Sequence, residues 1–172
     1  MHQVNTMSLK PRKAILLGTS ALVCLALSAP VMADDFVITS GSDTNGQFGD
    51  GDINGGDTVS LGIDLTTTGT NVGINTSGGT NTITVSETGR IKTVGYGAYG
   101  IYNLGASNET TLSGSITTGD DYAYGIVNIG AFNETTVSGS ITTSGETAYG
   151  ILNVGTGNET TISGSITLSG GG

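Results

Sequence analysis

Four oxygen-bearing side chains near the start of the chain are spaced like calcium ligands. They are Asp50, Asp52, Asn54 and Asp57. A calcium loop places oxygen ligands at alternate positions, a glycine at the sixth and a bidentate glutamate at the twelfth. The sixth position here is Gly55, but the twelfth is Leu61. Two interpretations remain, calcium ligation and a solvated acidic turn, and the second is the simpler. The sequence suggests no other cofactor.

Carboxylates also recur once per repeat, in the motif Asn-Glu-Thr-Thr. The glutamates of its three copies are Glu109, Glu134 and Glu159. Glycoside cleavage needs two carboxylates on either side of the scissile bond, and catalytic residues are not normally repeated at every turn of a structure. We therefore expect no catalytic residues and no enzymatic activity. The three Asn-Glu-Thr triplets have the form of glycosylation acceptors, but the repeat itself explains their number.

A regular array of hydroxyl groups is a candidate binding surface. Threonine and serine alternate with other residues in the segment 111–117, and the pattern recurs in the next two copies of the repeat. The set is Thr111, Ser113, Ser115, Thr117, Thr136, Ser138, Ser140, Thr142, Thr161, Ser163, Ser165 and Thr167. Since alternate side chains share one face of a strand, we expect a flat hydroxyl face about 14 Å across. Such a face suits ice binding or contact with carbohydrate, and a plain solvated face explains it as well.

The elements that position these groups are copies of one 25-residue unit. Regular copies span residues 98–122, 123–147 and 148–172, and each begins with Ala-Tyr-Gly-Ile. A fixed period of this size is typical of stacked supersecondary units. Looser copies extend the pattern back to residue 57. We place the recurring apolar residue at Val59, Val85, Leu112, Val137 and Ile162. This spacing predicts about five coils.

Within a copy, apolar residues recur with a period of two, which indicates strands. Leu112, Gly114 and Ile116 form one such run, and Val59-Ser-Leu-Gly-Ile63 is its expected counterpart in the first coil. One copy is too small to bury its own apolar face, so the copies must stack in register about 4.8 Å apart. The fold class that we expect is all-β, a single-stranded parallel β-helix (β-solenoid) of about five coils.

Stacking in register makes two further predictions about side chains. Asn103, Asn128 and Asn153 should form a ladder of amides at the bend that follows the first strand of each copy. The tyrosines that open the copies should stack in a core or edge ladder; they are Tyr99, Tyr124 and Tyr149. We expect this ladder to be structural rather than a platform for a ligand.

The first 33 residues have the pattern of a secretory signal peptide. Basic residues precede an apolar run at 14–27, and small residues lead to an expected cleavage site after Ala33. The run is too short for a transmembrane helix. An acidic, Gly- and Asn-rich segment or cap follows at 34–56, with a short strand expected at Phe36–Thr39, and the solenoid occupies 57–172.

Export would remove much of the chemistry that the chain contains. Cys24 and His2 lie in the expected leader, so the exported chain would have no thiol and no imidazole. Only Arg90 and Lys92 would remain to balance 14 acidic residues. An excess of negative charge disfavours nucleic acid and anionic lipid as partners.

These residues resemble the passenger domains of autotransporter outer-membrane proteins from Gram-negative bacteria. The resemblance covers about residues 34–172. It rests on the leader, on Asp57-Thr-Val-Ser-Leu61, and on coils of Asn-x-Thr-Thr-x-Ser-Gly-Ser-Ile-Thr-Thr with Ala-Tyr-Gly-Ile. It implies a right-handed parallel β-helix at the cell surface, often serving adhesion or biofilm formation. Members of this family are held in the outer membrane by a C-terminal β-barrel, whereas this sequence stops at Gly172. We expect either a truncated chain, which is the interpretation that we favour, or a protein secreted to the extracellular space without its own translocator.

The function that we expect is a non-enzymatic, exported stalk or adhesin-like passenger at the cell surface. Its partners would be a host or neighbouring cell surface, glycans or further copies of itself, with the outer membrane reached through the missing barrel. Two alternatives stay open. One is a polysaccharide-active β-helix enzyme, and the other is an ice-binding or self-assembling solenoid that uses the Thr/Ser face.

Overall fold

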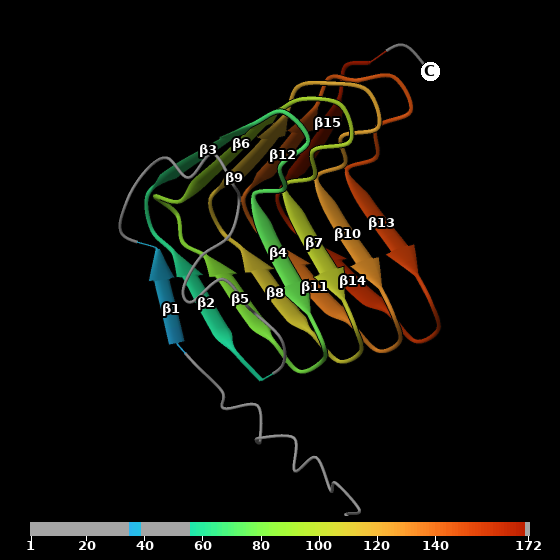
Figure 1. Cartoon of the computed structure of the whole chain (residues 1–172). Coiled ribbons are helices and arrows are strands. Elements are labelled where there is room, and N and C mark those ends of the chain that lie inside the picture. The colour runs from blue at the N-terminus through green and yellow to red at the C-terminus, as the bar shows by residue number, and fades with distance from the viewer. Residues whose placement is uncertain (1–34, 39–55, 171–172) are drawn as a thin grey trace, which may run out of the picture.

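The computed structural model describes residues 35–38 and 56–170, which form a parallel β-solenoid of about five turns (Figure 1). This part of the chain contains fifteen strands and no helix, so none of it has the long apolar helix that a helical membrane crossing needs. The expected signal peptide lies outside the described residues, as does most of the segment 34–56. The strand expected at Phe36–Thr39 is confirmed with a shift of one residue.

The strands form three parallel sheets, which we call walls A, B and C. Wall A contains β1 (Asp35–Ile38), β2 (Thr58–Leu61), β5 (Thr82–Val85), β8 (Glu109–Leu112), β11 (Glu134–Val137) and β14 (Glu159–Ile162). Wall B contains β3 (Asp64–Thr68), β6 (Arg90–Val94), β9 (Ser115–Thr118), β12 (Ser140–Thr143) and β15 (Ser165–Leu168). Wall C contains β4 (Ile74–Ser77), β7 (Ile101–Leu104), β10 (Ile126–Ile129) and β13 (Ile151–Val154). From Thr58 onward each coil supplies the walls in the order A, B, C (Figure 1).

Each strand pairs in parallel with its counterpart in the next coil, which confirms the predicted stack. In wall C, Ile126 is in register with Ile101 on one side and Ile151 on the other. Inside the walls lies a core of leucine, isoleucine and valine that runs the length of the solenoid. Threonine and asparagine side chains are also buried there, and most of them form hydrogen bonds to the next coil or to a neighbouring strand.

The register predicted for the first coil is wrong by two residues. Leu61, not Val59, is in register with Val85 and therefore with Leu112. Likewise Leu65, not Ile63, is in register with Ile91. The segment alternates with period two, so a shift of two residues keeps every side chain on the same face. Sequence pattern alone does not distinguish these two registers.

The continuous strand predicted at 111–117 is also wrong, because the chain turns a corner within it. β8 ends at Leu112 and β9 begins at Ser115, in different walls. Gly114 forms the corner, where a Cβ atom would collide with the carbonyl oxygens of Gly89 and Ser86 in the preceding coil. Only glycine allows two backbones to approach so closely.

Candidate binding surface

The predicted amide ladder exists, and it lies inside wall C rather than at a bend. The Nδ2 of Asn103 donates to Oδ1 of Asn128 at 2.7 Å, and Asn128 donates to Asn153 at the same distance. Each amide also donates to a threonine of the wall A strand that follows it in the chain, as Asn128 does to Thr135 Oγ1 at 3.0 Å. Asn103 and Asn128 are fully buried. The ladder therefore ties both neighbouring coils and neighbouring walls together.

A second asparagine column was not predicted, and it contains the asparagines of the Asn-Glu-Thr triplets. The backbone N–H of Asn108 donates to Oδ1 of Asn133 at 2.9 Å, and Asn133 donates in the same way to Asn158 at 2.8 Å. Asn81 extends the column towards the N-terminus, where it accepts the N–H of Asp57. The bonds join residues 24, 27, 25 and 25 positions apart, which gives the length of each coil.

This column decides the role of several candidate residues. Asn108 and Asn133 are 1% exposed, so their amides are structural in the folded chain and out of reach of a glycosylating enzyme. Asp57, the last of the four candidate calcium ligands, is 2% exposed and begins the column. The other three lie outside the described residues. Within residues 35–38 and 56–170, no group of three acidic or histidine side chains is placed to hold a metal ion.

The hydroxyl residues predicted to form one flat face instead follow the corner between two walls. Thr111 faces outward from wall A, whereas Ser115 and Thr117 face outward from wall B. Ser113 lies at the corner itself, where Ser138 Oγ donates to Ser113 Oγ at 3.3 Å. The array repeats from coil to coil, but it is bent at the corner and not one flat face.

The two basic residues of the solenoid lie on wall B. Arg90 Nη1 is 3.1 Å from Asp64 Oδ1, and both side chains are largely exposed, so this ion pair is worth little to stability. Lys92 is in register with Thr66 and Thr117, and these three residues border a shallow hollow of about 170 Å³.

Wall C carries an outer face that the sequence analysis missed. Its outward positions in the three regular coils, with the tyrosines that precede them, form three columns of apolar or aromatic side chains, which we call the apolar face. It consists of Tyr99, Tyr124, Tyr149, Tyr102, Val127, Leu152, Leu104, Ile129 and Val154. Leu104 and Val154 are 44% and 48% exposed, whereas Val127 at the centre is only 2% exposed. No charged side chain belongs to this face.

A signal for the apolar face was present in the sequence. The strands β7, β10 and β13 read Ile-Tyr-Asn-Leu, Ile-Val-Asn-Ile and Ile-Leu-Asn-Val, with apolar residues at both parities. A strand of this kind is normally covered on both faces. By contrast, the outward residues of β8 are Glu109 and Thr111, and those of β9 are Ser115 and Thr117.

The predicted tyrosine ladder is confirmed along one edge of the apolar face. The ring of Tyr124 lies 5.2 Å from those of Tyr99 and Tyr149, and it is nearly parallel to the first. Tyr99 also stacks on Tyr102 at 5.6 Å, so the column leans onto wall C. Partial burial, and then the neighbouring phenols of Tyr99 and Tyr149, raise the pKa of Tyr124 above its usual value of about 10.

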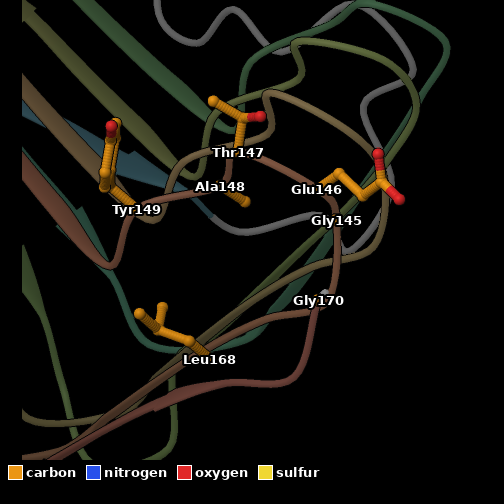
Figure 2. Close-up of a pocket in the computed structure, with 7 residues that line it drawn as sticks. All are labelled: Gly145, Glu146, Thr147, Ala148, Tyr149, Leu168 and Gly170. Carbon is orange, nitrogen blue, oxygen red and sulfur yellow. The ribbon is translucent and has the colours of Figure 1, made fainter. Parts of the chain in front are cut away.

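The last described coil leaves a hollow of about 490 Å³ beside this column (Figure 2). The loop that contains Ala148 and Tyr149 lies along one side, and Leu168 and Gly170 lie along the other (Figure 2). Leu168 is in register with Thr143 and, through it, with Thr118. In the inner coils that position is buried, and Thr118 Oγ1 donates to the carbonyl oxygen of Ala123 at 2.6 Å. The hollow is thus the uncovered end of the core and not a separate site.

Comparison of the chain with protein-family models, with curated proteins and with solved structures found no match. The function therefore has to be argued from the geometry of the solenoid alone.

Proposed function

We propose that this chain is a non-enzymatic stalk of an exported, surface-displayed protein of the autotransporter passenger type, and that it makes contacts through the apolar face. The observation that carries the proposal is the difference between the walls. The outward residues of β8 and β9 are serine, threonine or glutamate, whereas those of β7, β10 and β13, the wall C strands of the three regular copies, are aliphatic or aromatic. Exposed apolar patches of a few hundred Å² commonly mark interaction sites.

The size of the apolar face indicates how strong such a contact would be. Three rows of strands about 4.8 Å apart, each about six residues long, cover about 300 Å². A stable complex of two proteins buries about 800 Å² on each partner. A single pair of chains should therefore bind weakly. Many chains held close together on one surface would bind firmly, because each further contact becomes intramolecular.

The partner that we propose is a second copy of the chain, packed side by side through the same face. The face carries no charge, so it selects no oppositely charged partner. The stacked column of Glu109, Glu134 and Glu159 lies on wall A, outside the contact. The whole chain has a net charge of −9, so two copies repel each other at long range. Salt screens that repulsion while leaving the apolar contact intact.

The proposal is tested with beads coated densely with the chain. We expect the beads to clump, and to clump more at high salt. The triple variant Leu104→Thr, Ile129→Thr and Val154→Thr places β-branched residues, which suit strands, at all three positions but makes the outer column of the face polar. This variant should abolish clumping.

A matched variant on wall B, Thr117→Ala with Thr142→Ala and Thr167→Ala, serves as the control and should clump normally. Clumping lost in the control and kept in the wall C variant would assign contact to the hydroxyl columns instead. If the coated beads stay dispersed but bind to beads coated with glycans, the partner is carbohydrate and the proposal of self-association is wrong. Release of reducing ends from acidic polysaccharides would overturn the non-enzymatic assignment.

A further inference from the structure

Two exposed tyrosines from successive coils lie against each other at the edge between walls B and C. Tyr96 is in the loop between β6 and β7, and Tyr122 is in the next equivalent loop, between β9 and β10. Their ring centroids are 5.3 Å apart and the ring planes are tilted by 53°. The rings are 60% and 43% exposed, so small reagents reach both of them.

The backbone of Tyr122 is in a left-handed conformation that this loop also adopts in the neighbouring coils, with glycine at residue 97 and threonine at residue 147 in the equivalent places. Its φ is 56°, in the left-handed region that disfavours large side chains. The preceding coil has glycine at the equivalent position, Gly97, with φ of 66°. The loop is fixed by the N–H of Tyr122, which donates to the carbonyl of Glu146, and by the N–H of Ala123, which donates to the carbonyl of Asp120. The chain thus holds a large ring beside Tyr96 where glycine would be easier.

Phenol rings are the only side chains at this edge that oxidise readily to form a covalent link between coils. The single cysteine of the chain is Cys24, outside the described residues, so no disulfide joins one described coil to the next. A haem peroxidase with hydrogen peroxide removes one electron and one proton from each phenol. The two phenoxyl radicals then form a carbon–carbon bond between ring positions ortho to oxygen, Cε of each tyrosine, and the ring hydrogens move to the oxygens. The peroxide is reduced to two molecules of water.

The exposure of both rings, together with their tilt, distinguishes this pair from the others. Tyr124 and Tyr149 are also tilted, by 41° at 5.2 Å, but Tyr124 is the less exposed and lies within the stacked column. For the bond to form, two ring edges must meet. The rings of Tyr96 and Tyr122 are tilted by 53° and both are exposed, so they can turn their edges towards each other without leaving a packed stack. Tyr99 and Tyr124 are as close, at 5.2 Å, but their planes differ by only 3°. Stacked rings present faces to each other, so this pair would have to separate before it could react.

We propose that Tyr96 and Tyr122 are an oxidative cross-linking site, which forms a dityrosine bond between the last irregular coil and the first regular one. This inference is independent of the proposed function. The bond would enclose the segment between Tyr96 and Tyr122 in a covalent loop, and so lower the conformational entropy of the unfolded chain. We expect the cross-linked solenoid to melt at a higher temperature than the untreated one.

The test treats the full chain, at low concentration, with a haem peroxidase and hydrogen peroxide. The chain has no tryptophan, so dityrosine fluorescence is observed without interference. We expect a monomer lighter by two hydrogen atoms. Cleavage of the unfolded product after acidic residues, at Glu109 among others, separates the two tyrosines unless they are linked. The linked peptides also contain Tyr99, Tyr102 and Tyr124, so fragmentation of the linked pair by mass spectrometry must place the bond at Tyr96 and Tyr122.

Phenylalanine variants keep the ring packing while removing the phenol oxygen. Tyr96→Phe and Tyr122→Phe should each abolish the intramolecular product, whereas Tyr149→Phe, a control on the stacked column, should retain it. Circular dichroism checks that each variant keeps its β-sheet signal. A link that maps to Tyr99 and Tyr124, a product that survives in Tyr96→Phe, or cross-linking only between molecules would each overturn the proposal.

Discussion

Replacing Asn128 by alanine removes three hydrogen bonds from the middle of the buried amide ladder. Asn128 accepts from Asn103 at 2.7 Å and donates to Asn153 at 2.7 Å and to Thr135 at 3.0 Å. Its side chain is 1% exposed, so water does not take its place. The variant would leave one N–H of Asn103 and the hydroxyl of Thr135 buried with a partner missing. Each such group costs about 1–3 kcal/mol, and we expect a total loss of about 3–5 kcal/mol.

Asn153→Ala is the matched control for this prediction. Asn153 has the same place in the repeat, but it lies in the last described coil, where its side chain is exposed. Water replaces its partners there, so we expect a loss of about 1 kcal/mol. Urea unfolding followed by far-ultraviolet circular dichroism gives both values by linear extrapolation. If the two variants lose the same stability within about 1 kcal/mol, the buried ladder is not what joins the coils.

Three further predictions follow from the same geometry. Gly139→Ala should destabilise the solenoid by about 3 kcal/mol or more, because the new Cβ atom would collide with the backbone of the preceding coil. Gly119→Ala is the control, since a Cβ atom fits there and stability should hardly change. Thermal unfolding of the two variants makes the comparison. Because the pKa of Tyr124 is raised in the folded state, this phenol ionises in the unfolded chain first as pH rises above about 10. The free energy of unfolding should therefore fall above that pH. Thermal unfolding at alkaline pH should show a smaller fall for Tyr124→Phe than for the unaltered chain. Asp64→Asn breaks the exposed ion pair with Arg90 and should lower the free energy of unfolding by less than about 1 kcal/mol. The loss should stay below that limit at both low and high salt, as measured by urea unfolding.

The regular copies were predictable because three units of equal length and closely similar sequence leave little freedom in how they stack. Ile101 and its equivalents had to align, and once they did, Asn103 and its equivalents had to meet as well. The second asparagine column was missed because its bonds run from backbone to side chain. The looser coil contributes Asn81 to it, without the Asn-Glu-Thr-Thr motif that marks the later copies.

The binding surface was less predictable than the fold. Alternation correctly separated inward from outward residues, as in the run from Thr111 to Thr117, but it did not show that Gly114 turns the chain between two walls. Side chains that are evenly spaced in sequence therefore face different directions in space. For the same reason, outward apolar residues such as Leu104 were not recognised as a group, although they lie together on one wall.

The sequence by itself determined the period, the strand character, the parallel stacking of the regular coils and the acidity of the chain. These properties follow from residue types at fixed spacing, and burial of an apolar face allows few other arrangements. The tertiary structure alone decided the register of the first coil, the corner at Gly114 and the grouping of apolar side chains on wall C. The physical reason is that a period of two fixes only which face a side chain takes, whereas backbone contacts between coils fix where each strand starts and which wall it joins.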